Sequence, residues 1–241
     1  MASSTAIAVV AFVLAAAAGE AAHHWAYSGP EGPAHWGETC AAGKSQSPID
    51  IRTTSASHKK APPLAFSYRP TPLHIIDNGH SIQVDVDPGS TLSAGGARLP
   101  LVQFHFHRPS EEAIDGRHSA MVVHLVHRDT AGNLAVVAVL LREGAANPLI
   151  ATLWNNLPKR QGHEDSPPGV VIDPSQLLPA DRSYFSYVGS LTTPPCTEGV
   201  RWFVLKSPVT VSSAEIGTFA KLYPANARPL QPVNGREVLT D

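Results

Sequence analysis

Charged residues are scarce in this chain of 241 residues, and neither sign dominates. They make up 16% of the sequence, and the formal net charge is −2 with histidine neutral. Proteins that bind nucleic acid or anionic membrane surfaces normally carry basic patches or runs of lysine and arginine. Because no such run is present, the composition argues against nucleic acid, anionic membranes and polyanionic substrates as partners.

Long apolar runs are also missing. The longest, Ala6–Ala18, has 13 residues, whereas a membrane-spanning helix needs about 20. Small residues follow as far as Ala22, which is typical of a secretory signal peptide. We therefore predict a signal peptide over residues 1–22, cleaved somewhere in 18–22, a secreted or periplasmic protein, and no membrane span in the mature chain. No lysine or arginine precedes the apolar run, and a buried helix or a retained anchor is the alternative.

Cysteine is limited to Cys40 and Cys196. In the oxidising compartment that export implies, these two residues would pair and close a long loop. Two buried free thiols are the alternative.

The chain is rich in proline and histidine, with 22 and 12 residues, and 43% of its residues are hydrophobic. The apolar content is sufficient for a sizeable core, and the prolines favour turns and short elements over long helices. Neither an internal repeat nor a flexible linker divides the mature sequence. We expect one domain over residues 23–241, with an irregular segment up to Ile51.

Short runs of β-type sequence fill much of the domain. The turn sequence Asp129–Asn133 joins two of them into a predicted antiparallel hairpin. Two helices are also expected: one starts after Asn147 at Pro148, and the other after Ser212, where Glu215 completes a capping box. The fold class is therefore mainly β (α+β), with a large, mostly antiparallel, twisted central sheet and short peripheral helices. The predicted strands are 64–68, 74–76, 81–86, 101–107, 120–127, 134–141, 184–188 and 200–205.

The segment from Gln103 to His107 contains the clearest chemical pattern. Side chains alternate along a strand, so Gln103, His105 and His107 share one face while Phe104 and Phe106 point to the other. The two imidazoles can meet one metal ion, although two polar residues on the wet face of a sheet look the same. A third ligand is available from His124 or His127, which face opposite ways, and the periodicity does not choose between them.

Several further motifs follow one another along the chain: His24–Tyr27, Gly32–Pro33, His35–Trp36, Gln46–Asp50, Asn78–His80, Gln103–His107, His124–His127, Leu191–Glu198 and Ala227–Pro232. In this order they resemble the α-class carbonic anhydrase family over nearly the whole mature chain. That resemblance implies a zinc enzyme with His105, His107 and His124 as ligands, in which zinc-bound hydroxide attacks carbon dioxide. The products of the reversible reaction are bicarbonate and a proton, and sulfonamides or anions are expected inhibitors.

Further roles follow from the same resemblance. Thr192, backed by Glu111, would orient the zinc hydroxide, and His80 would shuttle protons with the help of Tyr27 and Asn78. Each motif also has a purely structural interpretation. A rigid turn would explain Thr192-Thr193-Pro194-Pro195, and a hairpin turn with an exposed histidine would explain Asn78-Gly79-His80. The implied wall of the carbon dioxide pocket, which would otherwise be ordinary core, consists of Val126, Val136, Leu191, Thr193 and Trp202.

Ligand histidines need acceptors for their second ring nitrogen. The resemblance assigns Gln103 to His105 and the backbone of Asn226 to His107. For His124 the family places a glutamate two residues earlier, where this chain has Val122. We therefore expect weaker zinc binding unless water or a polar neighbour substitutes.

A second departure is Glu112, where relatives commonly have histidine; it leaves open which of Glu111 and Glu112 supports Thr192, with alignment favouring Glu111. The alternative function is a catalytically weak binding or storage protein with the same fold.

Overall fold

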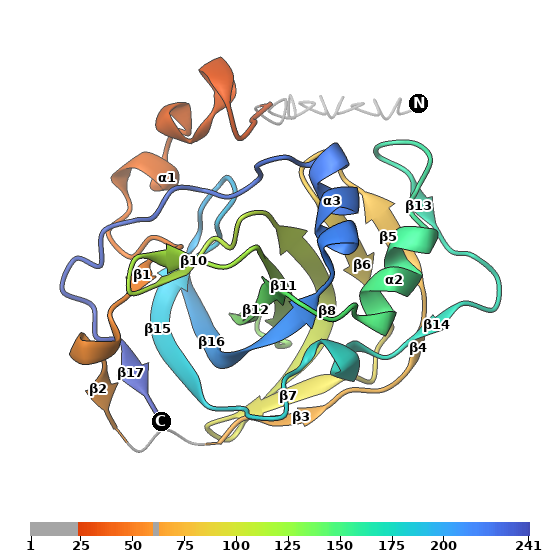
Figure 1. The fold of residues 1–241 in the computed structure, drawn as a ribbon. Helices are drawn as coiled ribbons and strands as arrows, with labels where there is room; N and C mark the ends of the chain where they lie inside the picture. Colours follow the sequence, from red (N-terminus) through yellow and green to blue (C-terminus); the bar gives the residue numbers. More distant parts are fainter. Residues whose placement is uncertain (1–23, 60–62) are drawn as a thin grey trace, which may run out of the picture.

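The computed structural model describes residues 24–59 and 63–241. The predicted signal peptide therefore lies outside the described residues. A twisted, twelve-stranded sheet forms the centre of the molecule (Figure 1). Its long inner strands, in spatial order, are β5 (His74–Asp77), β6 (Ile82–Asp85), β8 (Ala97–His107), β11 (Met121–Arg128), β12 (Leu134–Glu143), β16 (Glu198–Val211) and β15 (Tyr184–Ser190).

Shorter strands complete this sheet and form two small ones. β13 (Glu164–Asp165) lies at one edge, and β17 (Leu239–Thr240) followed by β2 (Ser57–His58) at the other, while β7 (Thr91–Ala94) branches from β8 and pairs with β3 (Ala65–Ser67). The small sheets combine β1 (Asp50–Ile51), β9 (Ala113–Ile114) and β10 (Arg117–His118), and β4 (Thr71–Pro72) with β14 (Val171–Ile172).

The predicted fold class and all eight predicted strands are confirmed, and the hairpin of β11 and β12 is antiparallel as expected. Among the described pairs of the large sheet, β12–β16 and β17–β2 are parallel and the others are antiparallel. The strands that alternation did not predict are mostly two-residue pairings, which are too short to show a period.

Alternation along the inner strands separates two apolar layers. Phe104, Phe106 and Val123 belong to the larger cluster on one face. Val122 and Trp202 belong to a smaller cluster on the other. Because side chains two residues apart share a face, His105, His107 and His124 lie on the side of the smaller cluster.

Two helices cover the larger cluster: α2 (Pro148–Asn155) and α3 (Ser213–Leu222), which lie side by side in Figure 1. The Asn147 side chain accepts hydrogen bonds from the first turn of α2, and Ser212 with Glu215 forms the expected capping box of α3. Trp154 joins the helices, because its indole N–H donates to the Glu215 carbonyl. Both predicted helices are thus confirmed.

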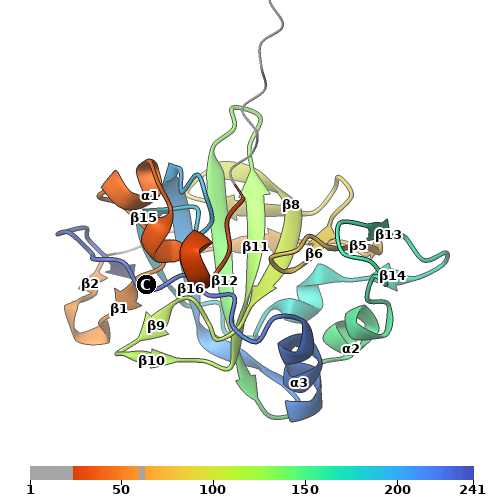
Figure 2. The same cartoon turned by 90° about the horizontal axis from the view of Figure 1, so that it is seen from above.

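The segment before Ile51 is more regular than predicted. It contains the short helix α1 (Thr39–Ala42) and two 3-10 turns, Gly29–Glu31 and Pro33–His35, and it ends in β1. In Figure 2 this segment lies beside β15 and β16. Hydrogen bonds within single turns stabilise it, which a search for long apolar periods does not detect. The remaining 3-10 turns are Thr53–Ser55 and Pro174–Leu177.

The predicted cysteine pair is confirmed as a disulfide between Cys40 in α1 and Cys196, which are 156 residues apart. It joins the N-terminal segment to the turn that follows β15. Within the described part of the chain, no helix has the length and apolar character needed to cross a membrane.

Candidate metal centre

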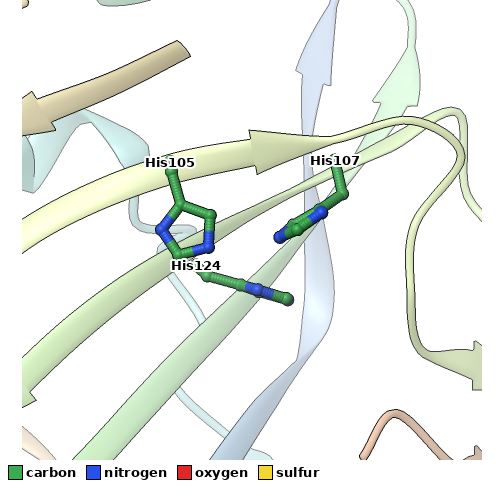
Figure 3. A group of neighbouring side chains, drawn as sticks. All are labelled: His105, His107 and His124. Carbon is green, nitrogen blue, oxygen red and sulfur yellow. The ribbon is translucent and has the colours of Figure 1, made fainter. Parts of the chain in front are cut away.

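Adjacent strands bring the three predicted ligands together. His105 and His107 project from β8, and the antiparallel register places His124 of β11 directly opposite His105. Figure 3 shows the three rings converging. One nitrogen from each ring lies within 4.8 Å of the others. This separation is small enough for a single ion to bridge all three.

The second nitrogen of each ring is held by the protein. Nδ1 of His105 lies 2.8 Å from Oε1 of Gln103, and Nδ1 of His107 lies 2.7 Å from the Asn226 carbonyl oxygen. Nε2 of His124 lies 3.1 and 3.3 Å from the two carboxylate oxygens of Glu112. Both acceptors that the resemblance implied for His105 and His107 are therefore in contact with their rings.

The electrostatics of two of the three rings fit a metal site, whereas at His124 burial is outweighed by Glu112 and Glu111, which raise the pKa of that ring. Burial, with the neighbouring His124, lowers the pKa of His105 to about 3, and burial likewise lowers the pKa of His107 well below its usual value. Neutral imidazole is the form that binds metal. The free Nε2 of His107 is buried and has no hydrogen-bond partner, which is costly unless a ligand is bound there. The donor set thus fits a metal ion that prefers nitrogen.

His127, the other candidate for the third ligand, does not join the site. Its fully buried ring faces the opposite side of β11, where Nε2 lies 2.7 Å from the Tyr68 hydroxyl. Burial lowers the pKa of His127 to about 4. It is therefore a neutral core residue.

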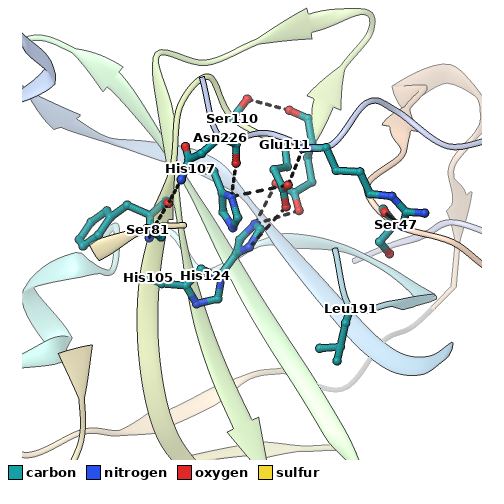
Figure 4. A network of polar contacts seen from close by, with 12 residues as sticks. Ser47, Ser81, His105, His107, Ser110, Glu111, His124, Leu191 and Asn226 are labelled. Atoms are coloured by element: carbon teal, nitrogen blue, oxygen red, sulfur yellow. Dashed lines mark hydrogen bonds and ion pairs between the residues drawn. The ribbon is translucent and has the colours of Figure 1, made fainter. Parts of the chain in front are cut away.

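Glu111 connects the histidines with Thr192 and the C-terminal segment, as Figure 4 shows in part. Its Oε1 accepts the backbone N–H of Arg228 at 2.8 Å. Burial raises the pKa of Glu111 to about 7, while His124, the Arg228 N–H and the Thr192 side chain act to lower it. Thr192 therefore lies close to Glu111.

Glu112 is the polar neighbour that the sequence left open. Position 122 holds valine instead of the family's glutamate, and Glu112 contacts the His124 ring in its place. The two departures from the family pattern, at positions 112 and 122, were the available signal. Read singly, neither reveals the contact, because twelve residues separate Glu112 from His124.

The residues expected to move protons lie beside one surface cavity of about 470 Å³, lined by Tyr27, Asn78 and His80 among others. The His80 ring stacks on Trp25, with centroids 3.7 Å apart. Asn226 also lines the cavity, and its side-chain amide donates to the His80 carbonyl. The same residue thus contacts both His80 and His107. The sequence did not indicate that Trp25 stacks on His80.

The expected pocket wall is mostly one apolar layer. Val126, Val136 and Trp202 are buried in the smaller cluster, and Leu191 packs against it. The Trp202 ring meets His124 edge-on at 4.9 Å between centroids. The Thr193 carbonyl accepts the Cys196 N–H, which places Thr193 in the turn that carries Thr192.

Comparisons with known proteins agree with this geometry. Residues 31–241 match the family described as eukaryotic-type carbonic anhydrase. A carbonic anhydrase from Nostoc sp. is 43% identical over 225 residues, which cover 90% of this chain and 85% of that protein. One from Pectobacterium carotovorum is 45% identical over 224 residues, which cover 90% of each.

Solved structures give the same result. The α-carbonic anhydrase from Thermovibrio ammonificans, in complex with the inhibitor sulfanilamide, has a TM-score of 0.86 and 41% identity; the match covers 90% of this chain and 98% of that one. The chain therefore belongs to the α-class carbonic anhydrase family.

Proposed function

We propose that this protein catalyses the reversible hydration of carbon dioxide to bicarbonate and a proton, with a zinc ion held by His105, His107 and His124. The observation that carries the proposal is the convergence of three imidazole nitrogens, with every opposite nitrogen already bound by a protein acceptor. When bound, zinc supplies Lewis acidity that makes water a nucleophile near neutral pH. Three neutral ligands leave the full charge of the ion available for that task.

Thr192 and Glu111 orient the attacking water. The Thr192 side chain is buried and close enough to Glu111 to lower the pKa of that carboxyl; in our proposal its hydroxyl donates to Glu111. With its single proton engaged, the hydroxyl oxygen can only accept a hydrogen bond. A water that donates to Thr192 then directs a lone pair away from it, towards the substrate. The Arg228 N–H fixes Glu111 in position.

The apolar wall suits the substrate. Carbon dioxide is non-polar and needs no charged anchor, so Val126, Val136, Leu191 and Trp202 hold it weakly beside the imidazoles. Thr193 borders the same site in our proposal.

His80 accepts the proton released in each turnover and passes it to solvent. Its cavity also contains Tyr27 and Asn78, which order the water between His80 and the reacting centre. Burial and the nearby His24 lower the pKa of His80. His80 therefore stays neutral, and able to accept a proton, to a lower pH than an ordinary histidine.

We also propose that residues 1–22 direct export and are removed, so that the mature protein is secreted or periplasmic. The apolar run with its small-residue flank and the Cys40–Cys196 disulfide support this proposal. N-terminal sequencing of protein from the exported fraction tests it. A mature chain that still begins at Met1 would contradict it.

Stopped-flow measurement of carbon dioxide hydration by protein of known zinc content tests the proposed activity. We expect hydration that depends on zinc and is inhibited by sulfanilamide, the compound bound in the Thermovibrio structure. Zinc-loaded protein that binds sulfanilamide but does not hydrate carbon dioxide would instead support a binding or storage role.

A further inference from the structure

The carboxylate of Glu112 is placed against the ring of His124. Both oxygens lie close to Nε2, at 3.1 and 3.3 Å, and both side chains are buried, with Glu112 0% and His124 1% exposed. A buried carboxylate without a partner is strongly disfavoured. The ring N–H of His124 is therefore the natural donor to Glu112.

This contact determines which nitrogen of His124 is left for a metal ion. A proton on Nε2, donated to Glu112, leaves the lone pair of a neutral imidazole on Nδ1. At His105 and His107 the protein instead holds Nδ1 and leaves Nε2. His124 thus has the opposite orientation to the other two rings, and Glu112 selects it.

The strand that carries His124 offers no such acceptor. Val122 lies two residues earlier on the same face, opposite His107 in the register of β8 and β11. It is fully buried in the smaller apolar cluster. The carboxylate therefore comes from outside the sheet, where Glu112 immediately precedes β9.

The backbone around Glu112 is fixed. The Ser110 hydroxyl donates to the Glu112 carbonyl at 2.7 Å and accepts the Ser119 N–H at 2.8 Å. On the other side, the Ala113–Ile114 strand pairs with β1. A carboxylate on a restrained backbone loses little entropy when it holds a ring.

We propose that Glu112 is the positioning residue for His124 and takes the place of a carboxylate at position 122. It fixes the tautomer and direction of the ring from a loop instead of from the ligand's own strand. The proposal rests on the proposed zinc function. Two adjacent glutamates then have separate tasks: Glu111 supports Thr192, and Glu112 supports a ligand.

Zinc retention tests the proposal without reference to activity. Zinc-loaded wild type and Glu112→Gln are mixed with excess chromogenic chelator, and the rate of zinc loss is recorded. We expect roughly 10- to 100-fold faster loss from the variant, as for other acceptors of ligand histidines. The cobalt-substituted forms should also differ in their visible absorption spectra, which report ligand geometry.

Glu215→Gln is the matched control. Glu215 is another buried glutamate, but it caps α3 and accepts from the Asn147 N–H, away from the histidines. We expect this variant to lose stability and to retain zinc like the wild type. Equal acceleration in both variants would overturn the proposal, because it would reflect general loosening.

Val122→Glu tests whether a carboxylate at position 122 can replace that of Glu112. In the Glu112→Gln background it should restore most of the lost zinc retention, because the new carboxylate lies on the face of His124. Alone it should not slow zinc loss, since two carboxylates would then compete in one buried place. Absence of rescue, or wild-type retention in Glu112→Gln, would overturn the proposal.

These outcomes separate the two hypotheses. A wild type that holds zinc but does not hydrate carbon dioxide contradicts the proposed function alone. A wild type that hydrates carbon dioxide, together with a Glu112→Gln variant of unchanged zinc loss and cobalt spectrum, contradicts the role of Glu112 alone.

Discussion

Each histidine of the candidate metal centre uses one ring nitrogen for the protein and leaves the other for the proposed ion. The acceptors differ in kind: a side-chain amide, a backbone carbonyl and a carboxylate. They also come from different parts of the chain. In the proposed zinc site, these three acceptors, which are not ligands themselves, contribute to metal affinity.

Removing a ligand should abolish metal binding. We expect His107→Ala to lose both bound zinc and hydration activity, because two imidazoles do not retain zinc in an otherwise open site. Elemental analysis and stopped-flow hydration measure the two effects. His163→Ala, at an exposed histidine, is the control and should match the wild type. Normal zinc content in His107→Ala would refute the ligand assignment.

Removing the proton acceptor should affect turnover and not binding. We expect His80→Ala to lower kcat in weak buffer with little change in kcat/KM, because proton release would become limiting. Added imidazole should restore the rate. A variant whose kcat does not depend on buffer concentration would show that His80 carries no proton.

At the scale of elements, the site depends on the turn between β15 and β16. Thr192 lies in this turn, and the disulfide anchors its far end at Cys196 to α1. The Leu191 N–H also bonds across the turn to the Thr197 carbonyl. The oxidised bridge thus helps to hold Thr192 near Glu111.

Replacing both cysteines with serine should lower the free energy of unfolding. A bridge that closes so long a loop contributes about 4–5 kcal/mol in the loop-entropy model, and measured losses are typically 2–5 kcal/mol. Denaturant unfolding of the oxidised wild type and the Cys40→Ser/Cys196→Ser variant gives the difference. Identical unfolding midpoints would mean that the bridge does not stabilise the fold.

Periodicity was sufficient to predict the inner strands and the two capped helices, because each is long enough to show an alternation or a cap. It was also sufficient to pair His105 with His107. It did not choose between His124 and His127, since that choice depends on which face of β11 meets the small apolar cluster. The family resemblance supplied the choice.

Local sequence patterns could not predict contacts between distant segments. Glu112 reaches His124 from outside the sheet, and Arg228 holds Glu111 across 117 residues. Such contacts depend on the tertiary arrangement of loops, which no period or cap encodes. For the Glu112 contact, the positions where the chain departs from its family were the only local indication.

At the scale of the whole molecule, buried neutral histidines make stability depend on pH. Burial lowers the pKa of His127 to about 4 from an ordinary value of 6.5. Between these two values the unfolded chain binds a proton that the native chain does not. Stability therefore falls as the pH is lowered through this window and, for this group, levels off below it.

The contribution of His127 can be isolated with His127→Gln. In zinc-free protein, we expect the free energy of unfolding of the wild type to fall more steeply between pH 6.5 and 4 than that of the variant. The difference in slope should approach ~1.4 kcal/mol per pH unit, the value for one proton. Denaturant unfolding at several pH values measures both slopes, and parallel curves would contradict the assignment.

The C-terminal segment completes the metal centre. Asn226 provides the acceptor for a ligand that precedes it by 119 residues, and its side chain also ties down the backbone at Phe106 and His80. All three histidines are synthesised well before Asn226, so these hydrogen bonds cannot form until the chain is nearly complete. In the proposed function, the site therefore reaches its full zinc affinity only when the C-terminal segment has folded against β8.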